Sequence, residues 1–403
     1  MKKKVLALVN AHFSTHTARL LEICKKLRES DNYNISISGR GEFMKFAYED
    51  GFRCIDTETL TKEEMEKIAH SPIPMLFTKK SIEKYYSIEK KILEEEKPDI
   101  ILREISRECA GIVAKKQGIF DISLLQANFS PFYKVLSFRS VNFPKQIDWL
   151  PYLSFIAPAA ESTIRRCIYG PLHEKVKNLD LKVIEHTLEG IQPDLTLYPD
   201  SEILFPCLIP KKYESYYKYI GPPFRKKQSE PPKWIEEFKK DKRKKILISN
   251  GTTGVHEKND FFIKSLKDKN YAVAFYTNNK TSLPTNFYGG KKFDIEEVLE
   301  NSDVFIMHGG IGSTYLGLIK GVPMIGLFNH FEQQINIHQL ELLKAGIGIH
   351  PKELTTKKLI ENIEILLNDK SYKENSKKTG EEIKKMNPPE LALKFIEERL
   401  AHL

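Results

Sequence analysis

The sequence predicts an α/β protein built from two units, each a parallel sheet of the doubly wound kind. Strand-like apolar runs alternate with helix-like segments through both halves of the 403-residue chain, which is the pattern of parallel strands joined by crossover helices. With 41% hydrophobic residues, a chain of this length can bury two separate cores. A stretch rich in Pro and Lys divides the halves and supports a two-unit organisation.

The elements of the first half follow from its hydrophobic pattern. An apolar run at residues 5–9 predicts a strand, and an amphipathic helix is predicted from about residue 16 to residue 29. The other strands predicted in this half cover residues 34–38, 53–56, 98–102, 122–126 and 194–198. Residues 129–183 mix aromatic with basic side chains in no regular period, so no element is assigned there.

The boundary between the units begins at Gly221-Pro222-Pro223 and ends in a lysine-rich run at residues 242–245. We therefore predict an N-terminal unit over residues 1–220, a linker over 221–245 and a second unit over 246–385, followed by a final helical segment at 386–403. The second unit starts with a strand at residues 246–249 and continues to a helix near 355–368.

Composition favours a cytoplasmic protein. The five cysteines form no Cys-x-x-Cys pair and leave an odd count, which suits a reducing compartment. The apolar run after the N-terminal lysines is too short for a signal peptide, and the chain has no run of about 18 apolar residues that could span a bilayer. The net charge of +9 suits an anionic substrate, an anionic membrane or nucleic acid, and by itself it selects none of them, because the lysines are spread over helical surfaces. We expect no nucleic-acid partner and no obligate protein partner.

The most informative segment is His308-Gly309-Gly310-Ile311-Gly312-Ser313-Thr314. A short apolar run at residues 303–307 predicts a strand before it, and residues 313–320 have helical character. The glycines therefore lie on a strand-to-helix turn, where the backbone can approach a ligand and the helix start offers unpaired N–H groups. A bare structural turn is the alternative, but the His, Ser and Thr side chains add polar groups and favour a diphosphate site.

A second group of residues predicts a catalytic base. His16 follows the strand at residues 5–9 and Glu104 follows the strand at residues 98–102, so both lie at the carboxyl edge of a parallel sheet, where ligands bind. A histidine can remove the proton of an acceptor hydroxyl, and a carboxylate can orient the imidazole. The alternative is that His16 caps its helix while Glu104 pairs with Arg103 or Arg107. His12 suggests no metal site, because no third ligand is evident.

The glycine-rich segment resembles the signature of the UDP-glycosyltransferase family of the GT-B superfamily. That signature is His-Gly-Gly, then Gly-Val-Pro, then Asp/Glu-Gln, and the chain carries Gly321-Val322-Pro323 and Glu332-Gln333 after the glycines. Gly312 and Leu316 stand where plant and animal members have Asn and a ribose-binding Glu. The bacterial antibiotic and macrolide-tailoring members lack both residues, so the resemblance is closer to that branch and leaves UDP and TDP both open.

The resemblance implies the GT-B architecture, two facing Rossmann-like domains with a central cleft, and a last helix at residues 389–403 that crosses back to the N-terminal domain. It also implies roles for individual residues. His16 falls on the catalytic histidine, and Glu104 stands where the family has a shorter Asp. The remaining implied site residues bind the donor: Thr252 and Thr253 with the turn 308–314 on the diphosphate, Glu332 and Gln333 on the hexose, and Phe293 as a weak counterpart of the aromatic that stacks on the base.

The reaction implied is a single displacement with inversion, needing no cofactor, because the nucleotide sugar is a substrate. No Asp-x-Asp metal-binding pattern is found, so we expect activity without a metal. The acceptor is a small hydrophobic molecule or a lipid. Phe132, Tyr133 and the aromatic and basic residues up to 143 suit peripheral association with the inner face of a membrane or, alternatively, an acceptor pocket. The alternatives are a GT-B sugar-nucleotide epimerase and an inactive nucleotide-sugar-binding scaffold.

Overall fold

A computed structural model describes residues 2–69, 78–133, 169–184, 187, 190–225, 233–249, 259–276, 283–290, 293 and 295–402. The chain divides into two compact units. Unit 1 holds the described residues up to Arg225 together with Met386–Leu403. Unit 2 holds the described residues within Lys226–Lys385. Each unit is described by itself below.

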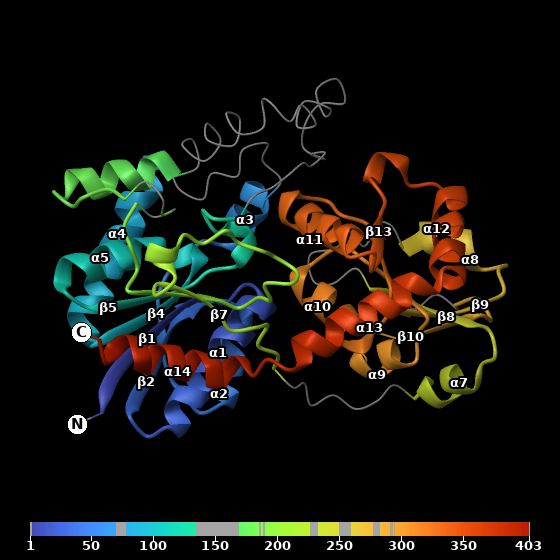
Figure 1. The fold of residues 1–403 in the computed structure, drawn as a ribbon, viewed down its shortest axis with the longest axis horizontal. Helices are drawn as coiled ribbons and strands as arrows, with labels where there is room; N and C mark the ends of the chain where they lie inside the picture. Colours follow the sequence, from blue (N-terminus) through green and yellow to red (C-terminus); the bar gives the residue numbers. More distant parts are fainter. Residues whose placement is uncertain are drawn as a thin grey trace. The chain divides into compact units, whose positions relative to one another are not determined.

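The described strands of unit 1 form one fully parallel sheet in the order β3-β2-β1-β4-β5-β6-β7 (Figure 1). Apolar side chains fill the strands next to the middle of the sheet, because both faces of these strands are covered. The strands are β1 (Lys3–Asn10), β2 (Tyr33–Arg40), β3 (Arg53–Asp56), β4 (Ile100–Glu104), β5 (Phe120–Leu124), β6 (Leu195–Tyr198) and β7 (Tyr217–Tyr219).

Successive side chains of β1 point to opposite faces of the sheet, and a hydrophobic cluster lies on each face. Val5, Ala7 and Val9 belong to the cluster that includes side chains of α1 and α14, whereas Leu6 and Leu8 belong to the cluster with α4 and α5. The α-helices of this unit include α1 (Ser14–Glu29), α2 (Lys45–Glu49), α3 (Lys62–Ala69), α4 (Lys79–Glu96), α5 (Glu108–Gln117) and α14 (Pro388–Leu400).

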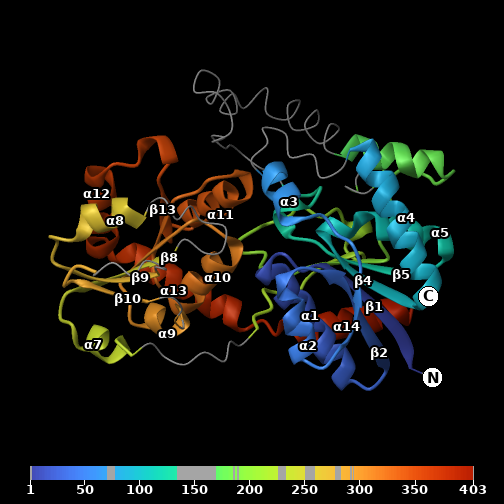
Figure 2. The ribbon, with the colours of Figure 1, turned by 180° about the vertical axis from the view of Figure 1, so that it is seen from behind.

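The last helix of the chain is part of unit 1. Ala392 and Ile396 of α14 are fully buried in the same cluster as Leu20 and Cys24 of α1. Lys26 of α1 forms an ion pair with Glu390 of α14. The two helices lie side by side in both ribbon views (Figures 1 and 2). Packing thus joins the end of the chain to its beginning.

Unit 2 repeats the architecture with a parallel sheet of order β10-β9-β8-β11-β12-β13. One side of its core is formed by strand residues with Phe262 of α8 and with Leu359 and Ile363 of α12. Helix α10 packs against α13 so closely that a side chain at Gly380 would collide with the carbonyl of Leu318.

Strands and helices alternate along unit 2 as they do along unit 1. The strands are β8 (Lys244–Ser249), β9 (Tyr271–Tyr276), β10 (Phe287–Gly290), β11 (Val304–Met307), β12 (Met324–Gly326) and β13 (Gly346–Gly348). The helices are α7 (Ile235–Lys240), α8 (Asn259–Leu266), α9 (Ile295–Glu300), α10 (Ile311–Lys320), α11 (Phe331–Leu342), α12 (Thr356–Asn368) and α13 (Lys370–Lys384).

The observed strand β4 lies two residues later than the strand predicted at 98–102. Helix α4 ends at Glu96, its C-cap Lys97 adopts a left-handed conformation with a φ of 47°, and Pro98 follows. Asp99 then ties the chain to β1 through two hydrogen bonds with the backbone of Lys4. Pro98 cannot donate a backbone hydrogen bond, so regular pairing starts after it and Glu104 becomes the last residue of the strand.

Candidate active site

The strand order of the unit 1 sheet reverses between β1 and β4, which are neighbours although the four α-helices α1 to α4 and two strands lie between them in sequence. Such a switch point leaves a crevice beyond the carboxyl ends of the two strands. His16, in the first turn of α1 after β1, and Glu104, at the end of β4, both lie there. The topology therefore brings the two predicted residues to one place.

His16 Nδ1 lies 3.0 Å from Glu104 Oε2. The carboxylate side chain is 3% exposed and the imidazole 22% exposed, so Glu104 is enclosed while His16 reaches the surface of the crevice. A carboxylate at Nδ1 favours the tautomer with a proton on that nitrogen, which makes Nε2 the basic nitrogen. The pair has the geometry of a base and its orienting group.

The second carboxylate oxygen of Glu104 is held by the protein as well. Its Oε1 accepts hydrogen bonds from the backbone N–H of Asn10, at 3.2 Å, and from the hydroxyl of Ser106. Burial alone would raise the pKa of Glu104, but the hydrogen bonds and charge of His16 and the bonds from Ser106 outweigh it and hold this pKa below its ordinary value. Glu104 is therefore an ionised carboxylate at neutral pH.

Phe13 and His12 flank this pair. The Phe13 ring lies 5.7 Å from the His16 ring between centroids and gives the imidazole an apolar neighbour. The backbone N–H of His12 donates to the side chain of Asn10. Among the residues that the structure describes, no group of three or more His, Cys, Asp and Glu side chains is arranged to hold a metal ion.

The glycine-rich turn occupies the corresponding switch point of unit 2, between β8 and β11. Gly309 has a φ of 85°, a conformation that L side chains rarely adopt. A Cβ at this position would lie 2.6 Å from Cδ1 of Ile337 and 2.9 Å from the carbonyl oxygen of Gln333. Both its conformation and its neighbours therefore require glycine.

Helix α10 begins at Ile311, two residues before the predicted start, so Gly312 and Ser313 belong to its first turn. Gly310 is its N-cap, with no side-chain hydrogen bond to the first turn and no acidic residue there. The amides of the first turn precede the first intrahelical bond and carry the positive end of the helix dipole. This helix start can receive an anion.

Thr314 lies near the start of α10. Its N–H and its hydroxyl both donate to the carbonyl of Gly310, and its side chain is fully buried. The helix turns this side chain inward, where its hydroxyl stabilises the turn, and the predicted diphosphate contact of Thr314 stays a prediction. Ser313, one residue earlier, is half-buried and lies on the open part of the first turn.

His308 follows β11 and is 7% exposed. Burial lowers its pKa to about 4, against a smaller opposite effect from a backbone hydrogen bond to Ser249, so the ring is neutral at pH 7. Nδ1 of His308 is buried and has no hydrogen-bond partner among the described residues. The ring therefore presents one unsatisfied nitrogen beside the turn, as expected of a group that meets a ligand.

The pair predicted to bind the sugar lies in the first turn of α11. Glu332 is half-buried, whereas Gln333 is 1% exposed and its Oε1 accepts the backbone N–H of Asn329 at 2.8 Å. One turn further, the buried Asn336 donates from Nδ2 to the carbonyl of Gly309 at 2.9 Å. The start of α11 thus supports the glycine turn directly.

Thr252 and Thr253 lie outside the described residues. Phe293 contacts Trp234, with ring centroids 5.1 Å apart and the rings nearly perpendicular. It belongs to an aromatic group in unit 2 with Phe238 and Tyr288. The ring of Phe293 therefore already packs against another side chain of the protein.

Three supporting residues were not singled out from the sequence: Asn10, Ser106 and Asn336. Each is a polar residue, and each is at least 93% buried. A polar residue that ends an apolar run, as Asn10 does after residues 5–9, is a signal that could have found this position. The partners of Asn10 and Asn336 come from distant segments, which local patterns do not reveal.

The sequence of this chain is similar to that of known glycosyltransferases. Residues 273–398 match the model of the erythromycin biosynthesis protein CIII-like C-terminal domain. The chain is 23% identical over 392 residues to the PGL/p-HBAD biosynthesis glycosyltransferase of Mycobacterium tuberculosis, covering 94% of this chain and 88% of that protein. It is 21% identical over 418 residues to the NDP-glycosyltransferase YjiC of Bacillus subtilis, covering 98% and 97%.

Solved structures show the same fold. The glycosyltransferase of kitacinnamycin matches with a TM-score of 0.72 at 16% identity, covering 99% of both chains. The calicheamicin glycosyltransferase CalG4 matches with a TM-score of 0.72 at 14% identity, covering 100% of this chain and 99% of the other. These structures confirm the predicted GT-B fold. The predicted enzyme class, a glycosyltransferase, is confirmed by the sequence relatives, which are themselves named glycosyltransferases.

Proposed function

We propose that this chain transfers a hexose from a UDP- or TDP-sugar to a hydroxyl of a small hydrophobic or lipid acceptor, with inversion and without a metal. The observation that carries the proposal is the pair formed by His16 and Glu104, 3.0 Å apart. A neutral hydroxyl is a poor nucleophile, so it must lose its proton as the bond to the anomeric carbon forms. His16 Nε2 takes that proton while Glu104 stabilises the imidazolium.

The leaving diphosphate is received by the start of α10. The amides of Gly312 and Ser313, together with His308, supply donors and positive potential where negative charge develops. His308 is neutral before the donor binds, and a nearby diphosphate favours its protonated form. Similarity to a spinosyn rhamnosyltransferase solved with thymidine diphosphate, which has a TM-score of 0.69 at 13% identity, supports a nucleoside diphosphate in this fold.

The acceptor is inferred from the apolar wall that Phe13 gives to His16. An aromatic or aliphatic alcohol rests on such a wall better than a charged one. The PGL/p-HBAD glycosyltransferase relatives support a lipid or phenolic acceptor for this chain. No helix among the described residues is long and apolar enough to cross a membrane. Peripheral association with an anionic membrane is proposed from the charge of +9 and is tested by salt-sensitive co-sedimentation with liposomes.

The test is an assay of purified protein with UDP-glucose, TDP-glucose and TDP-rhamnose against a panel of phenols and hydroxylated lipids, with and without EDTA. Release of the nucleoside diphosphate with a glycosylated product of inverted anomeric configuration, unaffected by EDTA, is expected. Nucleotide binding without turnover across the panel would indicate the scaffold alternative. Conversion of the sugar nucleotide without an acceptor would indicate an epimerase.

A further inference from the structure

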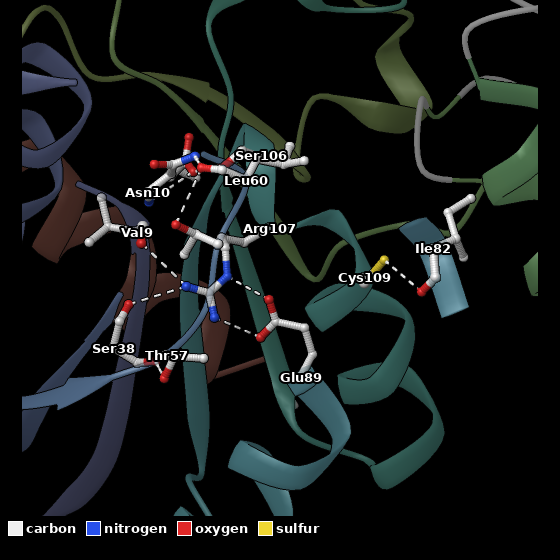
Figure 3. Close-up of polar contacts among 12 residues, drawn as sticks. Val9, Asn10, Ser38, Thr57, Leu60, Ile82, Glu89, Ser106, Arg107 and Cys109 are labelled. Atoms are coloured by element: carbon white, nitrogen blue, oxygen red, sulfur yellow. Dashed lines mark hydrogen bonds and ion pairs between the residues drawn. The ribbon is translucent and has the colours of Figure 1, made fainter. Parts of the chain in front are cut away.

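A buried ion pair lies behind the His16–Glu104 pair. Arg107 follows β4 in a short 3-10 helix (Ile105–Arg107) and is 2% exposed. Its Nε and Nη2 donate to the two carboxylate oxygens of Glu89, which projects from α4 and is also 2% exposed (Figure 3). Burial opposes the charge of Arg107, but Glu89 and then Glu104 hold the pKa of this guanidinium above its ordinary value. Arg107 is a permanent buried cation.

The remaining guanidinium nitrogen of Arg107, Nη1, contacts β1 and β2. Nη1 donates to the backbone carbonyls of Val9, at 3.2 Å, and Ser38, at 3.3 Å, near the carboxyl ends of β1 and β2 (Figure 3). Gly39 makes room for the first of these carbonyls, because a Cβ at this position would lie 2.2 Å from the oxygen of Val9. One side chain thus joins α4, β1 and β2 at the edge where the catalytic pair is held.

The carbonyl of Val9 belongs to the same peptide group as the N–H of Asn10. That N–H donates to Oε1 of Glu104. One peptide plane therefore connects the two charges: Arg107 bonds to its oxygen and Glu104 to its hydrogen. A cation at the oxygen polarises the peptide and strengthens the N–H as a donor. The chain of contacts runs from Glu89 through Arg107 and this peptide to Glu104 and His16.

We propose that Arg107, held by Glu89, is a positioning residue for the base: through the Val9–Asn10 peptide it fixes Glu104 and sets how readily the His16–Glu104 pair takes up a proton. This inference rests on the proposed function for its effect on catalysis, but not for its effect on the titration of His16. Arg107 itself touches neither substrate nor reacting atoms.

The proposal is tested by two sets of variants in which the titration of the His16–Glu104 pair should move in opposite directions. Replacing the ion pair by apolar residues of similar size, in Arg107→Met with Glu89→Met, removes the cation near Glu104 and weakens the Asn10 donor, so the His16–Glu104 pair binds a proton more readily. The low-pH limb of kcat/KM and the NMR titration of the His16 ring should move to higher pH by roughly half a unit or more. The value of kcat should fall about tenfold. Glu89→Gln leaves Arg107 unopposed and should move both readouts to lower pH.

Arg107→Lys separates charge from geometry. An ammonium keeps the positive charge but cannot span a carboxylate and two carbonyls, so kcat should fall without the upward shift. The matched control is Arg103→Met with Asp121→Met. Arg103 and Asp121 form an equally buried bidentate pair, at 2.8 and 2.9 Å, on β4 and β5. Losing it should lower the thermal midpoint without moving the titration of His16.

Shifts that are absent, or that have the same sign in the Glu89→Gln and double-methionine variants, would overturn the proposal. If the double variant does not fold, Glu89→Gln and Arg107→Lys still decide, since only the former should shift the titration. Transfer that survives His16→Ala would refute the proposed function even if the titration shifts as expected. Transfer that requires His16, combined with an unshifted titration, would refute this inference alone.

Discussion

In each unit the strand order reverses once, between β1 and β4 in unit 1 and between β8 and β11 in unit 2, and the two places carry different chemical groups. In unit 1 the edge between β1 and β4 is filled with ionised side chains, among them Glu104 and Arg107, each compensated by a partner. In unit 2 the edge between β8 and β11 carries a glycine turn, a neutral His308 and a helix start. The first arrangement suits the movement of a proton, and the second suits an anion that arrives with its own charge.

The comparison explains why the regions tolerate different kinds of change. The edge in unit 1 depends on charged side chains, so its function should be sensitive to the loss of one titratable group. The edge in unit 2 depends on backbone φ angles and close contacts, so its function should be sensitive to the addition of a single methyl group. The predictions below separate these two kinds of dependence.

The largest expected effect is the loss of transfer in His16→Ala. Without the base, kcat should fall about 1000-fold or more, while the affinity for UDP stays within about twofold. Rates and calorimetric titration with UDP measure the two quantities. His12→Ala is the matched control, because it removes an imidazole from the same segment and should keep transfer. A wild-type kcat in His16→Ala would show that His16 is not the base.

Gly309→Ala should weaken UDP binding about a hundredfold, through strain and the contact with Ile337. Gly51→Ala is the control, because Gly51 has a similar φ of 71° but nothing within 4 Å of an added Cβ. It should cost about 1 kcal/mol of stability and leave binding unchanged. Equal affinities of the two variants would show that the turn does not hold the nucleotide.

The neutral state of His308 predicts a pH dependence of stability. Its pKa is about 4 in the folded protein and 6.5 in the unfolded chain, so the unfolded state binds more protons between these values. This contribution to stability is present above pH 6.5 and falls by about 2 kcal/mol between pH 7 and pH 5. Urea unfolding at both pH values should show a smaller loss for His308→Gln. An identical loss would mean that His308 titrates normally.

The smallest expected effect is that of Asn336→Ala, which removes the hydrogen bond to the carbonyl of Gly309. It should cost about 1 kcal/mol of stability and raise the dissociation constant for UDP severalfold. Asn362→Ala removes a comparable bond to a backbone carbonyl in α12, so it should cost similar stability and spare binding. If both variants bind UDP equally, Asn336 supports the fold but not the site.

Much of this organisation follows from local patterns in the sequence. Apolar runs and glycines predict the parallel strands and the turn after β11, and the ends of two predicted strands point to His16 and Glu104. Local patterns place β4 two residues early because they do not weigh the bonds between Asp99 and Lys4, which come from another strand. They also do not reveal that the hydroxyl of Thr314 donates to the carbonyl of Gly310 within the first turn of α10.

The partners of Glu104 could not be predicted for a similar reason. Asn10 lies 94 positions from Glu104 and becomes a neighbour of the carboxylate only when β1 and β4 pair. Ser106 and Arg107 are close to Glu104 in sequence, but the side chain of Arg107 is held by Glu89 of α4, which local patterns do not record. The extra methylene of Glu104, compared with Asp, is accommodated because Oε1 is fixed by two donors while Oε2 meets His16. Such positions are set by tertiary packing, which periodicity along the chain does not record.

The burial of α14 against α1 has a practical consequence for protein engineering. An experimenter who exchanges halves between related enzymes at the Pro-rich segment would separate Ile396 from the surface it covers. A chimera should therefore take its last eighteen or so residues from the parent that supplies its first half. Shortening the chain from its C-terminal end would expose the apolar side of α1 to water, and the protein should aggregate before unit 2 unfolds.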